Sequence, residues 1–200
     1  MSSSNKINVI GGGLAGSEAA YQITKFGINV DLYEMRPKIK TEVHKTEYLA
    51  ELVCSNSFRS DDKEYNAVGL LHEELRMADS LIMKTADLNK VPAGSALAVD
   101  RDDFSKQVDQ KIKDNKKINI INEEVSNLDK FKNEIVIVAT GPLTSNKLSQ
   151  NIRDKTFENS LAFYDAIAPI VYKDSIDMKI AWKQSRYDKG DGDDYINCPL

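Results

Sequence analysis

A glycine-rich turn that joins a short apolar run to an alanine-rich segment restricts the fold of this chain more than any other feature. The run over residues 6–10 indicates a buried strand, the turn occupies residues 11–16, and the segment 17–26 is typical of a helix. A second apolar run over residues 28–33 indicates another strand. Because a helical crossover joins the two strands, we expect them to run parallel, as in a βαβ unit.

The turn carries the pattern Gly11-x-Gly13-x-x-Gly16, and each of these glycines has a physical reason. Gly11 permits a tight turn, Gly13 lets the backbone approach a pyrophosphate, and Gly16 lets the helix pack close to the strand. The helix N-terminus offers free N–H groups and a positive dipole to phosphates, and Glu34, about 20 residues further on, can accept hydrogen bonds from ribose hydroxyls. The pattern predicts a dinucleotide site, with a glycine turn that holds no ligand as the alternative. Its expected binding residues are Gly11, Gly12, Gly13, Leu14, Ala15, Gly16 and Glu34.

Two further features favour FAD over NAD as the dinucleotide. Arg36 follows Glu34 by two positions, and a basic side chain there can lie over the adenine or the ribose. The apolar run 135–139 ends in Ala139-Thr140-Gly141, which resembles a strand that passes close to the cofactor in two-dinucleotide flavoproteins. Arg36, Ala139, Thr140 and Gly141 are therefore added to the expected cofactor-binding residues.

The rest of the pattern completes an α/β fold. The sequence predicts a helix over 67–86, a strand over 96–99, a helix that Asp100 caps and that runs to about residue 114, and strands over 118–121 and 135–139. The last strand is apolar on both faces, which is typical of the middle of a sheet covered by helices. We expect a doubly wound, Rossmann-like FAD-binding domain with a parallel sheet and an inserted, mainly helical segment.

The predicted domain organisation follows from where this pattern weakens. Residues 1–145 form the FAD-binding domain, residues 35–99 within it form the inserted segment that carries Cys54, and residues 146–200 begin a second domain. The chain has 41% hydrophobic and 29% charged residues, as an ordinary globular protein does.

Composition also excludes several classes of site. The formal net charge of -4 argues against nucleic-acid binding by the surface as a whole, and the basic excess over residues 35–45 is expected to be a solvated loop. Cys54 and Cys198 show no disulfide framework, and the aspartates between Asp188 and Asp194 miss the calcium-loop spacing, so no metal is expected. The chain has neither an apolar run of about 18 residues nor a signal peptide, so a cytoplasmic protein without a membrane span is expected.

Beyond the glycine pattern the chain has six further blocks, of which two, the one that contains Cys54–Ser57 and the one at residues 185–190, are far more specific than that pattern. The six blocks lie at residues 50–60, 66–71, 91–94, 98–101, 139–145 and 185–190. In this order they closely resemble the TrmFO family, the folate- and flavin-dependent tRNA (uracil-5-)-methyltransferases of bacteria, with the MnmG (GidA) family of tRNA wobble-uridine modifiers as the nearest relative. Members of the family are longer, and they carry a second FAD-contacting segment and a cysteine in a Gly-Cys-x-Pro setting. Cys198, in Asn-Cys-Pro, is a different motif.

The resemblance implies a specific reaction. The family transfers a one-carbon unit from 5,10-methylenetetrahydrofolate to C5 of the T-loop uridine of tRNA, and NAD(P)H supplies electrons through FAD. A thiolate that adds to C6 of uracil makes C5 nucleophilic, and a base must remove the C5 proton. Without the resemblance, Cys54 would be interpreted as a structural thiol. The resemblance implies instead that Cys54 is the catalytic residue, either as the nucleophile or as the base. Arg59 can lower the pKa of its thiol if the loop folds back.

Three alternatives remain open on this sequence. They are a wobble-uridine modification flavoprotein of the MnmG type, a general NAD(P)H-dependent flavin oxidoreductase without an RNA substrate, and a nucleotide-binding module without catalytic activity. The sequence assigns no role to its two histidines and leaves the oligomeric state open.

Overall fold

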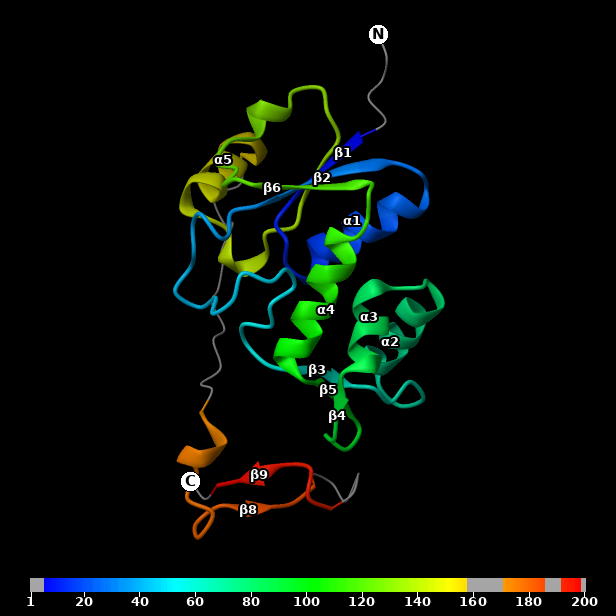
Figure 1. Cartoon of the computed structure of the whole chain (residues 1–200), viewed down its shortest axis with the longest axis vertical. Coiled ribbons are helices and arrows are strands. Elements are labelled where there is room, and N and C mark those ends of the chain that lie inside the picture. Colours follow the sequence, from blue (N-terminus) through cyan, green and yellow to red (C-terminus); the bar gives the residue numbers. More distant parts are fainter. Residues whose placement is uncertain (1–5, 158–170, 186–191, 199–200) are drawn as a thin grey trace. The chain divides into compact units, whose positions relative to one another are not determined.

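The computed structural model describes residues 6–157, 171–185 and 192–198 (Figure 1). These residues fall into two compact units. The first unit joins the chain up to Val53 with the stretch that begins at Ser105, and the second joins Cys54–Phe104 with the described C-terminal residues. No helix in the described part of the chain is long and apolar enough to cross a membrane.

Two sequence features lie partly outside the described residues. Residues 186–190 of the 185–190 block are not described, and neither are Asp188 and Asp191 of the aspartate-rich loop. The structure therefore reports on neither of these features as a whole.

The first unit is built on a parallel sheet in the order β6-β2-β1-β7 (Figure 1). Its strands are β1 (Lys6–Ile10), β2 (Asn29–Glu34), β6 (Ile118–Asn122) and β7 (Val136–Val138). Residues 6–10 pair in parallel register with residues 29–33, so that Ile10 lies beside Tyr33. The predicted βαβ unit and the predicted α/β class with a parallel sheet are confirmed.

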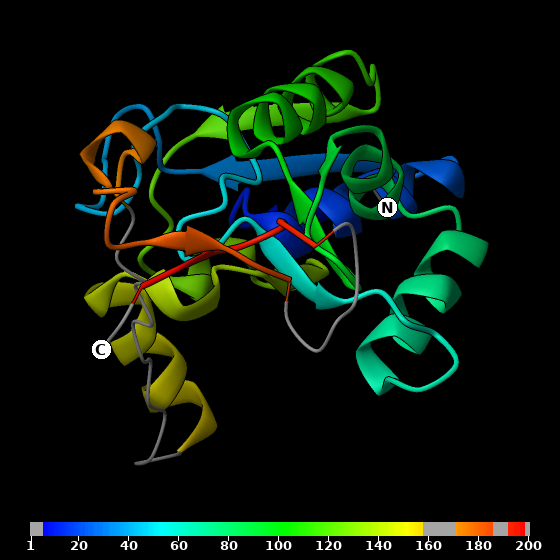
Figure 2. The same ribbon diagram turned by 90° about the horizontal axis from the view of Figure 1, so that it is seen from below.

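Helices cover both faces of this sheet, as Figures 1 and 2 show for α1 in dark blue and α5 in yellow. Helix α1 (Leu14–Lys25) packs on β1 and β2, where Val9 and Leu32 are fully buried. On the opposite face, Ile10 and Tyr33 lie in an apolar cluster with residues of the 3-10 helix η1 (Leu128–Phe131) and helix α5 (Asn146–Thr156). The ring centroids of Tyr33 and Phe131 are 5.2 Å apart, edge to face.

The position of β7 corrects one expectation. The run 135–139 was expected in the middle of the sheet, but β7 pairs only with β1 and lies at the edge of the sheet within the described residues. Ile135 is 64% exposed and Val138 is 40% exposed. An apolar run indicates that a strand can be buried on both faces, whereas its place in the sheet depends on whether a further strand pairs with it.

The second unit contains a small antiparallel sheet in the order β3-β5-β4 as well as helices. Its elements are β3 (Ser57–Ser60), α2 (Ala67–Met77), α3 (Leu81–Leu88), β4 (Lys90–Val91), β5 (Ala96–Val99), η3 (Lys173–Ser175), β8 (Trp182–Lys183) and β9 (Ile196–Asn197). The predicted strand 96–99 is present. Strands β8 and β9 pair with each other, antiparallel.

The prediction of a single helix over residues 67–86 is wrong in one respect, because the structure has two helices there, α2 and α3. Asp79 has a φ of 61°, in the left-handed region that ends a helix. Ser80 then begins α3, and its Oγ accepts a hydrogen bond of 3.1 Å from the Met83 N–H. The apolar spacing continues across this break, so periodicity alone does not reveal it.

Helix α4 (Arg101–Lys113) begins in the second unit and continues into the first. The predicted cap is confirmed, since Asp100 Oδ1 accepts hydrogen bonds from the N–H groups of Asp102 and Asp103 at 3.1 and 3.0 Å. The buried apolar residues of this helix are Phe104, Val108 and Ile112.

Replacing the cap residue tests this local structure. Asp100→Ala is expected to lower the free energy of unfolding by about 1 kcal/mol, because two N–H groups lose their acceptor. Asp100→Asn keeps a side-chain oxygen there and serves as the control. Urea denaturation followed by circular dichroism measures both, and equal midpoints for the two variants would contradict a capping role.

Candidate nucleotide-binding site

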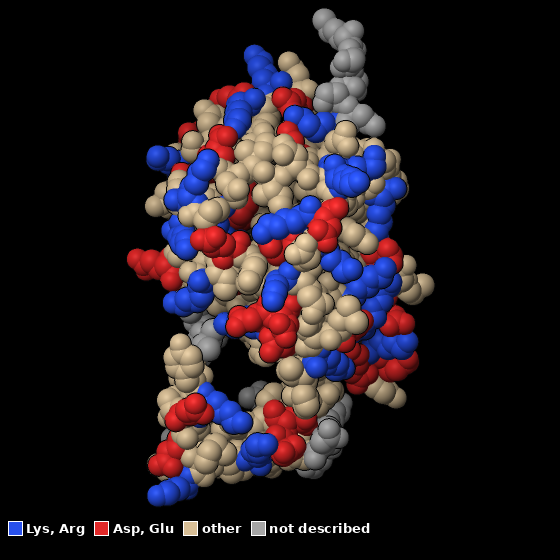
Figure 3. Space-filling model, viewed as in Figure 1, with Lys and Arg blue, Asp and Glu red and all other residues tan. Residues whose placement is uncertain are grey.

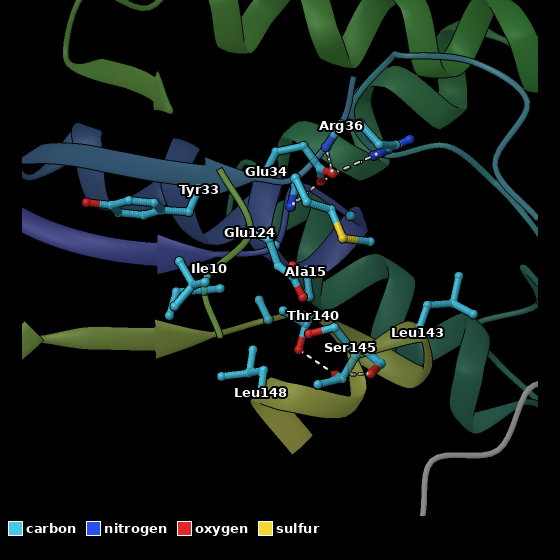
Figure 4. A pocket seen from close by; sticks show the side chains of 18 of the residues that line it. Ile10, Ala15, Tyr33, Glu34, Arg36, Glu124, Thr140, Leu143, Ser145 and Leu148 are labelled. Atoms are coloured by element: carbon cyan, nitrogen blue, oxygen red, sulfur yellow. Dashed lines mark hydrogen bonds and ion pairs between the residues drawn. The ribbon is translucent and has the colours of Figure 1, made fainter. Parts of the chain in front are cut away.

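A cavity of about 310 Å³ opens in the first unit, at the carboxyl ends of its parallel strands (Figure 4). Ligands bind at this edge of open α/β sheets. The lining residues are Ile10–Ala15, Tyr33–Arg36, His44, Glu51, Val53, Glu123–Val125, Ala139–Ser145 and Leu148. The cavity therefore brings together residues 11–15 of the glycine turn, the end of β2 and the Ala139–Gly141 segment, as the sequence predicted, whereas Gly16, also an expected binding residue, is not among the lining residues.

The glycines of the turn differ in what surrounds them. Gly11 has a φ of +101°, and a Cβ there would lie 2.7 Å from the backbone oxygen of Ala139. A Cβ at Gly16 would lie 1.8 Å from the backbone oxygen of Gly11, so the tightest contact of Gly16 is with the turn itself. A Cβ at Gly13 would meet nothing within 4 Å. Gly13 thus borders open space in front of the α1 N-terminus, where a ligand phosphate has room.

The Gly-x-Gly-x-x-Gly pattern gave no steric role to Gly12. In the structure, both backbone polar groups of Gly12 are hydrogen-bonded to residues outside the turn. Its N–H donates to Glu34 Oε2 at 2.9 Å, and its carbonyl accepts from the N–H of Ala50 at 2.8 Å. A Cβ at Gly12 would lie 2.5 Å from Leu49 Cδ2 and 2.8 Å from Glu34 Oε2. No sequence signal identifies Leu49 and Ala50 as neighbours of the turn, because they come from a distant, irregular segment.

Glu34 lies at the end of β2 and is only 7% exposed. Its Oε1 accepts from the backbone N–H and the Nε of Arg36, both at 3.0 Å, and its Oε2 accepts from Gly12. Burial by itself raises the pKa of this carboxyl, but the hydrogen bonds and positive charge of Arg36 outweigh burial, so the pKa of Glu34 is lowered. Glu34 is therefore charged at neutral pH.

Arg36 is held by two carboxylates rather than free to lie over a ligand. Its side chain is 2% exposed; its Nε and Nη2 donate to Glu34, and its Nη1 donates to Glu51 Oε2 at 3.2 Å. Figure 4 shows Glu34 and Arg36 side by side at one end of the cavity. Glu51 was missed as a site residue, since only its place in the 50–60 block drew attention to it.

The other end of the cavity is formed by Ala139–Gly141 and the segment that follows. The Ala139 N–H donates to the carbonyl of Ile10 at 2.8 Å, which places it beside the glycine turn. The hydroxyls of Thr140 and Thr144 lie 2.5 Å apart, after which η2 (Gly141–Leu143) leads to α5. The Oγ of Ser145, at the N-cap of α5, is buried and has no hydrogen-bond partner within the described structure. An orphaned polar atom at this wall is consistent with a ligand that supplies its partner.

Cys54, the predicted catalytic residue, is exposed and is not among the residues that line this cavity. It is the first residue of the second unit and follows Val53, which does line the cavity. Asn56 fixes the chain next to Cys54, because its Nδ2 donates to the Val99 carbonyl at 3.0 Å. Arg59 has a φ of 73°, at an irregularity in the pairing of β3 with β5. The catalytic role of Cys54 stays a prediction.

Two glycine substitutions compare a position where a Cβ has no room, Gly16, with one where a Cβ enters open space, Gly13. Gly16→Ala is expected to lower the free energy of unfolding by at least about 2 kcal/mol, because its Cβ overlaps a backbone oxygen. Gly13→Ala, the matched control, is expected to cost less than about 1 kcal/mol, since its Cβ enters open space. Thermal unfolding of both variants measures the difference, and equal stabilities would contradict this geometry.

Comparison with known proteins agrees with the architecture. The family model described as glucose inhibited division protein A matches residues 6–200. The chain is 61% identical, over 97% of its length and 43% of the relative's, to the methylenetetrahydrofolate–tRNA-(uracil-5-)-methyltransferase TrmFO of Paramagnetospirillum magneticum. The proteins of the same name from Bradyrhizobium diazoefficiens and Bartonella henselae are each 60% identical over 98% of the chain and over 42% and 43% of their own lengths. The chain thus spans less than half the length of these curated relatives, and it belongs to the glucose inhibited division protein A family.

Proposed function

We propose that this chain carries the FAD-binding part of a methylenetetrahydrofolate-dependent tRNA (uracil-5-)-methyltransferase. The observation that carries this proposal is the identity of about 60% to relatives of that name over nearly the whole chain. The cavity at the carboxyl edge of the parallel sheet supports it independently, because that edge is where dinucleotides bind in this class of fold.

The residues of the cavity fit FAD. The N–H groups at the α1 N-terminus and the open space in front of Gly13 suit the pyrophosphate, and the end of β2 at Glu34 suits the ribose of the adenosine. Ala139, Thr140 and Gly141 form the opposite wall. When bound, FAD supplies the redox chemistry that converts a methylene unit to a methyl group, with NAD(P)H as reductant. The chain's own part here is to bind and orient the cofactor.

Cys54 is proposed to act on the uracil. The thiol is exposed, so a macromolecular substrate can reach it. As a nucleophile its thiolate adds to C6 and leaves the electron pair at C5 for the incoming carbon; as a base it accepts the C5 proton. Both roles are compatible with the exposed thiol, and the experiments below distinguish them.

We propose tRNA and the folate donor as substrates on the same basis, since the names of the relatives include both. The T-loop uridine and a cytoplasmic location are proposed from the family resemblance alone. On the face drawn in Figure 3, basic and acidic side chains are interspersed. Contacts to RNA phosphates on this face would accordingly use individual lysines and arginines rather than one broad basic surface.

A second candidate is tRNA wobble-uridine modification, because the matching family model is described as glucose inhibited division protein A. Identification of the modified position in tRNA distinguishes it from the first candidate. Methylation of the T-loop uridine supports the proposal, and modification of the wobble uridine alone contradicts it.

Flavin retention tests the cofactor proposal. Gly13→Val is expected to abolish FAD binding, because a branched side chain fills the space in front of the α1 N-terminus, while the fold is kept. The absorbance spectrum of the purified variant, compared with that of the wild type, measures bound flavin. A full complement of flavin in Gly13→Val would show that the cofactor binds elsewhere.

Methyl transfer tests the role of Cys54 in a protein that has the full length of the relatives. Cys54→Ala is expected to lose methylation of tRNA by at least about 100-fold while its flavin is still reduced by NAD(P)H, because general bases alone contribute that much. Cys198→Ala, which removes the other exposed thiol, is the matched control and is expected to stay active. Near-normal methylation by Cys54→Ala would return Cys54 to a structural role.

Trapping distinguishes the two roles of the thiol. The C5 fluorine of 5-fluorouridine in tRNA cannot leave as a proton does, so a nucleophilic Cys54 is expected to remain bonded to C6. Mass spectrometry of the wild-type complex detects this adduct at Cys54. Loss of methylation in Cys54→Ala without an adduct in the wild type would favour the base.

A further inference from the structure

The end of β2 carries two residues that point to different nucleotides. In dinucleotide sites an acid at this place accepts hydrogen bonds from a ribose 2′-hydroxyl, whereas a nearby arginine accommodates a 2′-phosphate. Here Glu34 and Arg36 are both present, and both line the cavity. The sequence alone therefore does not decide which ribose the cavity accepts.

The contacts of Arg36 decide how much of its charge is left for a ligand. Its Nε and Nη2 donate to Glu34 at 3.0 and 3.3 Å, and its Nη1 donates to Glu51 at 3.2 Å. All three nitrogens of a side chain that is only 2% exposed are thus bonded to carboxylates. Charge-assisted pairs of this kind are strong, and two carboxylates more than neutralise one guanidinium.

Glu51 is itself held firmly in place. Its Oε1 accepts from the backbone N–H of Lys45 at 2.8 Å, and its Oε2 accepts from the Oγ1 of Thr46 at 2.9 Å. The Glu51 side chain is 6% exposed, so its charge is poorly screened by water. Turning Arg36 toward a ligand would leave this buried carboxylate without its cation, which is costly.

The remaining charged groups of the cavity lining do not offset these carboxylates. Burial and the charge of Arg36 lower the pKa of His44, so this histidine adds no positive charge at neutral pH. Of the two glutamates after β6, Glu123 is paired with Lys130 at 2.6 Å, whereas Glu124 adds further negative charge. A ligand group placed beside Arg36 therefore meets a surplus of negative charge.

We propose that Glu51 is a specificity residue of this cavity: together with Glu34 it neutralises Arg36, so that the cavity accepts an adenosine ribose with a free 2′-hydroxyl and rejects one with a 2′-phosphate. This inference rests on the proposed dinucleotide site. Its consequence is that 2′-phosphorylated nicotinamide nucleotides do not compete with FAD for the cavity.

Calorimetric titration of the nucleotide-free 200-residue chain tests the inference with two ligands, ADP-ribose and 2′-phospho-ADP-ribose, which differ only in the 2′-phosphate. The wild type is expected to bind ADP-ribose at least about 100-fold more tightly, because like charges that are placed together in a binding site are strongly unfavourable. Glu51→Gln keeps the shape of residue 51 and one of its two acceptor oxygens but removes its charge. It is expected to narrow the ratio of affinities by about tenfold or more, mainly through tighter binding of 2′-phospho-ADP-ribose.

Glu47→Gln is the matched control, because it removes the same charge from an exposed side chain that pairs with Lys40 at the surface. It is expected to keep the wild-type ratio. Glu51→Asp keeps the charge of residue 51, so it is expected to keep most of the wild-type preference for ADP-ribose over 2′-phospho-ADP-ribose.

The outcomes separate the two proposals. If neither ligand binds the wild type, the dinucleotide site itself is wrong. If ADP-ribose binds and 2′-phospho-ADP-ribose binds equally well, the specificity inference is wrong, and this result needs no variant to fold. If Glu51→Gln and Glu47→Gln show the same ratio, the discrimination does not come from Glu51.

Discussion

The hydrogen bond from the Gly12 N–H to Glu34 Oε2 connects two parts of the cavity lining, and the rest of the candidate site depends on it. It joins the glycine turn after β1 to the end of β2, two strands that already lie side by side in parallel register. The carboxylate that accepts it is buried and charged, so it needs a cation nearby, and Arg36 provides one. A Cβ at residue 12 would lie 2.8 Å from the same Glu34 oxygen and 2.5 Å from Leu49 Cδ2, so a side chain there would collide with both.

Residues 50 and 51, from the irregular stretch after β2, contribute to the structure of the cavity. Ala50 donates its N–H to the carbonyl of Gly12, and its own carbonyl accepts from Ser105 Oγ at 3.4 Å. Its φ of 52° is unusual for a residue with a side chain and persists because the surrounding contacts determine it. Glu51, the next residue, completes the partners of Arg36. A substitution at Ala50 or Glu51 therefore affects the contacts of the glycine turn, although many residues separate the two in sequence.

The errors of the sequence-based predictions have a common cause. The helix expected over 67–86 is interrupted at Asp79 and Ser80, where a left-handed residue and a new cap restart it without disturbing the apolar spacing. The run 135–139 has the composition of a central strand, yet β7 has only β1 beside it within the described sheet. In both cases the periodicity describes which face of an element is apolar. It contains no information about backbone dihedrals at one residue or about pairing with another strand.

The sequence by itself determined the βαβ unit, the place of the glycine turn at a helix N-terminus and the acid at the end of β2, because these depend on short-range spacing and on the conformational freedom of glycine. Only the tertiary structure decided what Arg36 does. The chain between Arg36 and Glu51 is irregular and has no period from which their contact can be inferred. The pairing of these two charges comes from the folding of that loop against the turn, where burial makes an unpaired charge too costly to persist.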